Sequence, residues 1–484
     1  MPKHRHPFAA LGLSGACGLA LAHPPTHPPT HPPADHPDAG SETVHVCWPI
    51  DESGLLTGLT LEYPLDPAVT RMLNPRERGN AADNRVDLVF VGDGYTASEM
   101  GQYAADVANV TASFFSYEPF IAYEPYFRIT RVDVVSPESG VDHDTAQGVL
   151  RDTALDMGYW CNDIERLLCV NTGKAYNAIA AAGIPDVDQV LALANSSKYG
   201  GAGYSGSNLG TAAGQNGSAV EIAIHEMGHS LGDLADEYTY GGPQVYAGGE
   251  PGAANSSIYD AGTQLAQQRK WHRWLIGPLD PRFNDPIDTY EGASYSELGI
   301  YRPSQNSMMR SLFRQFNQPS GESIIRAIYQ EVSPIDDATA PGQYSQDDTL
   351  WVSPMLPIGH ALEVTWTLNG TDRPEFNGQT SLVLADLGLA EGSHTVGVRV
   401  VDQTDMVRDP AIRDTYMTDQ RSWSVEIGCD LLADLSGDGV VDNGDIAVFV
   451  ALFLSSDLAA DFNGDGVIDN GDIASFVEAF LNPC

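Results

Sequence analysis

The middle of the chain alternates between short apolar runs and longer amphipathic stretches. Residues 86–91 are an apolar run, which predicts a buried strand. Thr96 and Glu99 have the spacing of a capping box, and the helix that they open is expected to continue toward Phe115. Residues 128–135 are rich in β-branched side chains, which predicts a further strand. Alternating strands and helices of this kind indicate an α/β domain.

From about Ser333 the apolar positions change to a period of two, which is typical of strands with one buried face. The turn Asn369-Gly370 follows the first of these strands. The alternating apolar residues are Leu362, Val364, Trp366 and Leu368, then Val396, Val398 and Val400, and finally Trp423, Val425 and Ile427. This pattern predicts an all-β, immunoglobulin-like sandwich of short antiparallel strands. It contains no catalytic grouping, so we interpret it as a spacer or a substrate-docking domain.

Near the C-terminus, residues 434–445 and 461–472 repeat one acidic loop. Each copy places oxygens at loop positions one, three, five, nine and twelve, a carbonyl at seven and glycine at six, which is the calcium pattern of an EF-hand loop. Position twelve is aspartate, not the usual bidentate glutamate, so the coordination need not copy an EF-hand. The predicted calcium ligands are Asp434, Ser436, Asp438, Val440, Asp442 and Asp445 in the first loop and Asp461, Asn463, Asp465, Val467, Asp469 and Asp472 in the second.

Each loop is followed by a predicted helix with phenylalanines at matching positions, Phe449 and Phe453 against Phe476 and Phe480, which gives the two units a shared apolar seam. These duplicated units resemble a type I dockerin. The resemblance implies a small α-helical calcium-binding module whose partner is a cohesin domain. Dockerins often carry Ser or Thr at loop positions ten and eleven, whereas both loops of this chain have Asn-Gly there. This departure argues against a cellulosome-type partner, and we expect calcium-dependent docking to a cell-surface protein, cohesin-like or other.

The strongest chemical signal is the motif HEMGH, in which His225 and His229 stand four positions apart. The apolar stretch before the motif contains no proline and begins at Ser218, which is placed to cap a helix. On a helix the two histidines project from one face and can hold a single zinc ion, with Glu226 beside it as a general base.

A catalytic zinc site needs three protein ligands and an open position for water. The candidates for the third ligand are Asp233, Asp236 and Glu237. Asp233 lies one helical turn beyond His229, whereas Gly232 allows the helix to end and the chain to turn back. That turn favours Asp236, with Glu237 as the alternative ligand.

The chain from Arg85 to about Gln330 resembles the bacterial IgA-specific metallopeptidase family. Besides the zinc helix and its Leu-Ala-Asp-Glu-Tyr continuation, four blocks resemble that family in the same order: residues 87–100, 132–144, 195–201 and 299–312. The resemblance implies a zincin-like α/β fold and a zinc endopeptidase, with Asp236 as third ligand. The wider metzincin group places its third ligand six residues after the second histidine, a position that is Ala235 here.

The resemblance also suggests roles for residues outside the zinc helix. Met308 and Met309 look like the methionine turn beneath the zinc, with Met309 the closer match, although ordinary core methionines give the same pattern. In metzincin-like enzymes the substrate pairs with an edge strand, and residues 188–197 are the strand-like run nearest to the motif. The sequence does not choose an oxyanion donor among Tyr238, Tyr301 and Arg310.

The first residues predict export. A basic start, a short apolar stretch and the Ala-Leu-Ala site before His23 are typical of a signal peptide, and a lipoprotein anchor at Cys17 is the competing interpretation. A His- and Pro-rich segment follows and is typical of an extended linker. The predicted organisation is a signal peptide (1–22), a linker (23–40), an N-terminal extension (41–84), a metallopeptidase domain (85–332), a β-sandwich (333–428) and a dockerin-like module (429–484).

Cysteine usage agrees with an oxidising compartment. Cys161 with Cys169, and Cys429 with Cys484, are the predicted disulfides. Removal of the signal peptide leaves Cys47 without a predicted partner.

The net charge of −40 argues against nucleic acid and anionic membranes as partners. Beyond the signal sequence, no apolar run is long enough to predict a membrane span. We therefore expect a secreted zinc endopeptidase that hydrolyses peptide bonds in extracellular proteins. The alternative is a non-catalytic, calcium-dependent adhesion or scaffold protein with a structural or decayed zinc site.

Overall fold

The computed structural model describes residues 41–49, 56–66, 69, 84–185, 187–204, 206–239, 244–283, 285–427 and 431–481. The predicted signal peptide, the His- and Pro-rich linker and the predicted disulfide between Cys429 and Cys484 lie outside these residues. The chain divides into two compact units. The first comprises residues 1–336, 355–362 and 401–419, and the second comprises residues 337–354, 363–400 and 420–484.

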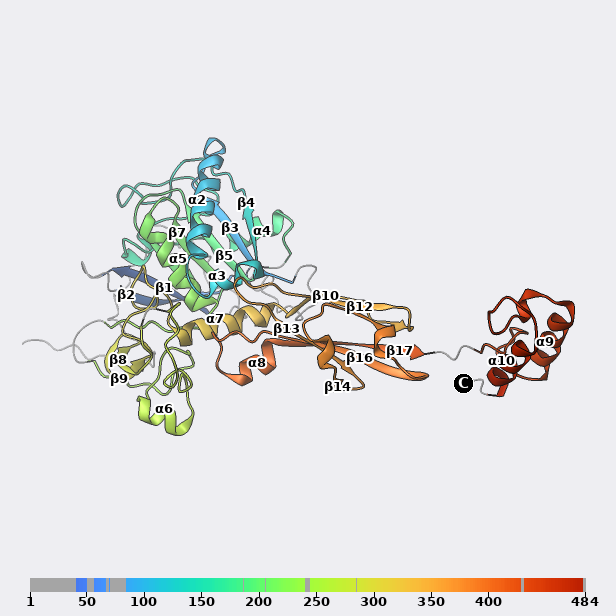
Figure 1. Cartoon of the computed structure of the whole chain (residues 1–484). Helices are drawn as coiled ribbons and strands as arrows, with labels where there is room; N and C mark the ends of the chain where they lie inside the picture. The colour runs from blue at the N-terminus through green and yellow to red at the C-terminus, as the bar shows by residue number, and fades with distance from the viewer. Residues whose placement is uncertain are drawn as a thin grey trace, which may run out of the picture. The chain divides into compact units, whose positions relative to one another are not determined.

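A mixed sheet forms the centre of the first unit, with strand order β2-β1-β6-β7-β5-β3-β4 (Figure 1). Strands β7, β5, β3 and β4 run parallel to one another, whereas β6 is antiparallel to β7 and to β1, and β1 is antiparallel to β2. The strands are β1 (Ser41–Pro49), β2 (Leu56–Pro64), β3 (Val86–Asp93), β4 (Phe127–Val132), β5 (Gln189–Ala194), β6 (Gly201–Tyr204) and β7 (Leu209–Ala213).

The predicted strands at residues 86–91 and 128–135 are confirmed as β3 and β4, although β4 ends at Val132. Every residue of β3 is buried, as expected for an inner parallel strand that is covered on both faces. The prediction that residues 188–197 form an edge strand is wrong, because β5 pairs with β7 on one side and with β3 on the other. Its continuous apolar sequence is that of an inner strand.

Helix α5 (Gly217–Ser230) carries the HEMGH motif and packs against β6 and β7 (Figure 1). Its N-terminal cap is Asn216, whose side-chain oxygen accepts the backbone N–H of Ser218 at 3.0 Å. The prediction that Ser218 itself caps the helix is therefore wrong by two positions, because Ser218 already lies in the first turn.

The other helices of the first unit surround this arrangement. The predicted capping box of Thr96 and Glu99 is confirmed, and it opens a short 3-10 turn that leads into α2. The helices are α2 (Met100–Phe114), α3 (Phe120–Tyr123), α4 (Thr172–Ala181), α6 (Ala261–Gln267), α7 (Gln318–Glu331) and α8 (Pro410–Tyr416), and the hairpin strands are β8 (Tyr290–Ala293) and β9 (Ser296–Arg302). The predicted disulfide between Cys161 and Cys169 is present.

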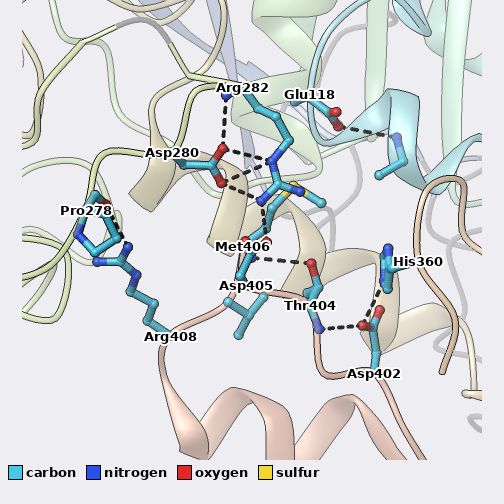
Figure 2. Close-up of polar contacts among 12 residues, drawn as sticks. Glu118, Pro278, Asp280, Arg282, His360, Asp402, Thr404, Asp405, Met406 and Arg408 are labelled. Atoms are coloured by element: carbon cyan, nitrogen blue, oxygen red, sulfur yellow. Dashed lines mark hydrogen bonds and ion pairs between the residues drawn. The ribbon is translucent and has the colours of Figure 1, made fainter. Parts of the chain in front are cut away.

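Buried polar contacts connect two segments from the C-terminal half of the chain, residues 355–362 and 401–419, to the rest of the first unit. Figure 2 shows Asp402 beside His360, whose Nε2 lies 2.9 Å from the Asp402 Oδ1. The Oδ2 of Asp402 accepts the hydroxyls of Tyr123 and Tyr329, each at 2.7 Å. Burial alone would raise the pKa of Asp402, but the hydrogen bonds from His360 and the two tyrosines hold it below its usual range.

Arg282 makes a second connection of this kind, since it pairs with Asp280 and with Asp405 in the later segment (Figure 2). These contacts explain why pieces that are distant in sequence form one unit with the sheet.

The second unit contains β-strands in two sheets, of order β10-β12-β15 and β11-β17-β16-β13-β14. The predicted period-two pattern is confirmed, because nine of its ten apolar residues are buried, with Leu368 partly buried, and Trp366 packs beside Trp423 with ring centroids 6.0 Å apart. The predicted turn at Asn369-Gly370 is also confirmed, with φ of 50° and 78°. The expectation of antiparallel strands throughout is wrong for β11, which pairs parallel to β17.

The bounds of these strands are β10 (Ile335–Ala338), β11 (Gln343–Tyr344), β12 (Thr349–Pro354), β13 (Glu363–Leu368), β14 (Thr371–Asp372), β15 (Ser381–Val383), β16 (Gly392–Val401) and β17 (Thr418–Ile427). Helices α9 (Asn443–Ser455) and α10 (Asn470–Leu481) follow the two acidic loops. The rings of Phe449 and Phe476 stack with centroids 4.1 Å apart, so the predicted seam exists. Among the described helices, none combines the length and the apolar character needed to cross a membrane.

Candidate active site

His225, His229 and Asp236 meet at one buried point beside α5. Their Nε2, Nε2 and Oδ1 atoms form a triangle in which each pair of atoms is 3.1 Å apart. All three residues are buried. Among the residues that the structure describes, they are the group of three His, Cys, Asp or Glu side chains whose ligand atoms lie close enough to share a metal ion.

The hydrogen bonds of the two imidazoles favour a cation at this point. The Nδ1 of His225 lies 2.9 Å from the Met308 carbonyl, and the Nδ1 of His229 lies 2.6 Å from the Leu234 carbonyl. Carbonyl oxygens only accept, so both Nδ1 atoms carry the proton and a neutral ring presents a bare Nε2. The two Nε2 atoms and the Asp236 Oδ1 then face one another as three acceptors, and their lone pairs repel one another unless a cation lies between them. Four ligands placed tetrahedrally about 2.0 Å from zinc are roughly 3.3 Å apart, which is close to the observed spacing.

Without a metal ion, a proton on His229 supplies the positive charge that the triangle favours. Burial lowers the pKa of His229, but the Asp236 carboxylate outweighs it and raises that pKa to about 9. Burial likewise opposes ionisation of Asp236, yet the imidazoles of His229 and His225 hold its pKa well below the usual range. The carboxylate is therefore ionised, as a metal ligand must be.

The turn after α5 brings Asp236 back to the helix. The N–H of Leu234 donates to the carbonyl of Gly228 at 3.1 Å, and Asp233 adopts a left-handed conformation with φ of 52°. A left-handed residue just after the last helical turn is a common way for a helix to end. The predicted reversal is present, but its left-handed residue is Asp233, whereas Gly232 is needed because a Cβ there would lie 2.8 Å from the Gly228 carbonyl.

The structure separates the three candidates for the third ligand. Asp233 is exposed and pairs with Arg326 at 3.2 Å. Glu237 is fully buried and points into a different network, in which its carboxylate accepts hydrogen bonds from Asn255 at 2.9 Å and from Asn317 and Ser307, both at 2.7 Å. Only Asp236 of the three has a carboxylate oxygen in the triangle.

Glu226 lies against strand β6. It is buried, and a Cβ at Gly203 would overlap its carboxylate, so glycine at this position of β6 makes room for the side chain. The charge of Glu226 contributes to the raised pKa of His229, which places the carboxylate within electrostatic reach of the triangle. Sequence reasoning missed Gly203, because the register between β6 and α5 is a tertiary property.

Met308 and Met309 are both fully buried beneath α5. The Met308 carbonyl fixes the His225 ring, as described above. The Met309 sulfur lies against Gly228, where an added Cβ would be only 2.5 Å from it, and the Met309 carbonyl accepts the N–H of Glu237 at 2.8 Å. The two methionines therefore support both the helix and the segment that follows it.

Tyr295 is a further residue of the site that the sequence did not reveal. Its hydroxyl donates to Oδ2 of Asp236, and the N–H of Ser294 donates to the Asp236 carbonyl at 2.9 Å. Both residues lie in the β8–β9 turn with positive φ, 44° for Ser294 and 67° for Tyr295. Neither is Gly or Asn, so the turn carries no sequence signal of the usual kind.

Of the three residues considered as oxyanion donors, Tyr238 contacts a residue of the triangle. Its ring stacks on that of His225 with centroids 6.4 Å apart. Arg310 donates to the carbonyl of Gln305 at 2.9 Å, and the backbone of Tyr301 pairs with Ser257. The sequence made no choice among them, and we assign the role to none.

The acidic loops of the second unit are ordered by their own backbone. Asp434 accepts the N–H groups of Gly437 and Gly439, each at 2.8 Å, and Asp461 accepts that of Gly466 at 2.8 Å. Backbone donors, led by those of Asp442 and Asp469, lower the pKa of Asp445 and of Asp472 respectively. The loops thus present ionised carboxylates, the hard oxygen donors that calcium prefers.

The remaining residues of the predicted calcium sets lie in the same two loops and take part in equivalent contacts. Asp442 caps α9 by accepting the N–H of Gly444 at 2.6 Å, and Asp469 accepts that of Gly471 at 2.6 Å. Both loops therefore share one geometry, as the repeated sequence predicts.

Comparison with known proteins bears on the first unit. No curated protein matches the chain. The family model described as IgA peptidase M64 matches residues 75–281, which include α5, both histidines, Glu226 and Asp236. The Met308–Met309 turn and Tyr295 lie beyond the matched residues. The match supports a peptidase and hence a hydrolase. Residues 75–281 of the chain are therefore similar to the IgA peptidase M64 family.

Proposed function

We propose that the chain is a secreted, zinc-dependent endopeptidase of zincin-like fold. The observation that carries the proposal is the meeting of three buried ligand atoms beside Glu226, in a region that is similar to a peptidase family. His225, His229 and Asp236 would hold the zinc ion, and Glu226 would act as the general base.

Zinc bound there would lower the pKa of a water molecule to about 7 and polarise the peptide carbonyl. The Glu226 carboxylate accepts the proton of the attacking water and delivers it to the leaving amine. The carbonyls of Met308 and Leu234 hold the imidazoles in one tautomer. Tyr295 holds the carboxylate of Asp236.

Export is part of the proposal. It is supported by the N-terminal sequence and by the disulfide between Cys161 and Cys169, a bond that persists in oxidising compartments. The substrate is then an extracellular protein or peptide.

For the C-terminal module we propose calcium binding and docking to a cohesin-like or other cell-surface protein. An open apolar groove between α9 and α10 supports this role. Its lining includes exposed aliphatic side chains that a partner would cover, among them Val450, Leu454 and Val477.

The alternative, a non-catalytic scaffold with a structural zinc site, has less support. A structural site closes its tetrahedron with four protein ligands, whereas the group formed by the described residues has three. The open position is what a hydrolytic site requires.

The test compares the full chain with its Glu226→Gln variant in the digestion of a mixed denatured protein pool, with zinc content measured for both. We expect about one zinc per chain in each and cleavage by wild type alone. Cleavage by the variant at the wild-type rate would remove Glu226 from the mechanism. A wild-type chain that holds zinc but cleaves nothing would favour the scaffold.

A further inference from the structure

A pocket of about 440 Å³ lies beside His229, one of the three residues of the triangle. Its volume is in the range of pockets that bind small ligands. The end of α5, helix α7 and the loop around Ala253 form its walls. Lys270 holds that loop in place by donating to the Ala253 carbonyl at 2.8 Å. The pocket is therefore a defined depression that shares a wall with the candidate active site.

Arg326 supplies the permanent positive charge of the pocket lining. Its side chain is 31% exposed, and its Nη2 lies 3.2 Å from the Oδ2 of Asp233. Within the part of the chain that the structure describes, its Nε is buried without a hydrogen-bond partner. A guanidinium that is partly desolvated and makes one such contact keeps donors for a further anion.

Asp233, which also lines the pocket, competes weakly for this guanidinium. Its side chain is 76% exposed, so water and salt screen its charge. The pair has one contact at 3.2 Å, not the two parallel bonds of a bidentate pair. A carboxylate that enters the pocket can therefore share Arg326 or replace Asp233.

We propose that this pocket binds an acidic side chain of the substrate, Asp or Glu, carried by a residue close to the cleaved bond. The inference rests on the proposed peptidase function of the adjoining site. A pocket of this volume is roughly 9 Å across, and an extended peptide advances about 3.3 Å per residue. Because the pocket adjoins His229, a substrate side chain within about two residues of the reacting carbonyl reaches the pocket. The planar guanidinium then pairs with the carboxylate, an interaction that a neutral amide of equal size cannot reproduce.

The test uses acetylated octapeptides of Ala and Gly that carry one Glu, Gln or Lys at each position in turn. Cleavage is followed by mass spectrometry with the full chain, with Arg326→Gln and with Arg326→Glu. We expect kcat/KM for Glu to exceed that for Gln about tenfold at one position. Arg326→Gln should abolish this preference by lowering kcat/KM for the Glu peptide, and Arg326→Glu should favour Lys. The matched control is Arg314→Gln, which removes an exposed arginine outside the pocket lining.

A second readout separates this inference from the proposed function. Binding of the same peptides, labelled with a fluorophore, is measured by anisotropy on Glu226→Gln with and without Arg326→Gln. A Glu preference in binding that Arg326→Gln removes supports the pocket, even if wild type cleaves no peptide. Equal binding of Glu and Gln peptides by both chains, or a wild-type preference for Lys, overturns it. Cleavage without a Glu preference likewise overturns the pocket and leaves the peptidase intact.

Discussion

The hydroxyl of Tyr295 donates to Oδ2 of Asp236, while Oδ1 of the same carboxylate faces the two imidazoles at 3.1 Å. The tyrosine therefore fixes the rotation of the carboxylate and leaves one oxygen directed at the candidate metal position. Partners of this kind orient a ligand without touching the metal.

Replacement of Tyr295 by Phe removes this hydrogen bond and leaves the ring in its packing against Tyr238. We expect zinc affinity to fall about 10-fold to 100-fold, because the Asp236 carboxylate is then free to rotate. Zinc affinity is measured by competition with a chromophoric chelator. The control is Tyr290→Phe in the same hairpin, whose hydroxyl makes a long contact of 3.4 Å to the Pro286 carbonyl. Unchanged affinity in Tyr295→Phe would show that the carboxylate is held by other contacts.

Replacement of Gly203 by Ala tests the position of Glu226. The new methyl group would overlap the Glu226 carboxylate, so the side chain or the helix must shift. Overpacking costs about 1–3 kcal/mol, and we expect kcat/KM to fall about 10-fold to 100-fold if this cost displaces Glu226. Zinc content should not change if Glu226 alone shifts, because the three atoms nearest to the added methyl group all belong to Glu226. Gly217→Ala, where the added atom meets no neighbour among the described residues, is the control. An active Gly203→Ala enzyme would show that Glu226 has room to move.

Local sequence patterns predicted those parts of the fold and site that depend on short spacing. His225 and His229 share a face because a helix repeats every few residues, and the Asn369-Gly370 turn follows from residues that accept positive φ. The same reasoning predicted β3 from its apolar run.

The features that the sequence missed depend on long-range pairing. A continuous apolar run identifies β5 as a strand, but its neighbours in the sheet are set by segments far along the chain. Gly203 and Tyr295 reach the site from β6 and from the β8–β9 turn, so no spacing relative to the HEMGH motif predicts them. Asp236 and Glu237 are adjacent, and only the exact path of the turn after α5 separates their roles.

Glu42 gives the first unit a pH-dependent stability. Burial, opposed by the Ser207 hydrogen bond, raises its pKa from 4.5 to about 7, so the folded chain binds a proton that the unfolded chain releases. Its contribution is present in full below pH 4.5 and is lost as the pH rises through about 7. The shift corresponds to a contribution on the order of 3 kcal/mol.

This contribution is measured by denaturant unfolding of wild type and Glu42→Gln at about pH 5 and about pH 8. The free energy of unfolding of Glu42→Gln should rise relative to that of wild type between about pH 5 and about pH 8, because wild type must bury a charged Glu42 at the higher pH. Because both chains carry the same metal sites, pH effects on metal binding cancel in the difference. A difference that is the same at both pH values would mean that Glu42 does not titrate in this range.

Calcium should order the C-terminal module. Each loop gathers several aspartates, and their ionised carboxylates repel one another unless a cation neutralises them. We expect about two calcium ions per chain, and faster hydrogen exchange across residues 431–481 after calcium is removed. Asp434→Ala should remove one ion and expose α9 first, and Asp461→Ala should do the same for α10. The control that keeps both ions is Asp457→Asn, a change at the cap of the short turn Leu458–Ala460 between α9 and the second calcium loop. Exchange that does not respond to calcium would show that the stacked Phe449 and Phe476 hold the helices without it.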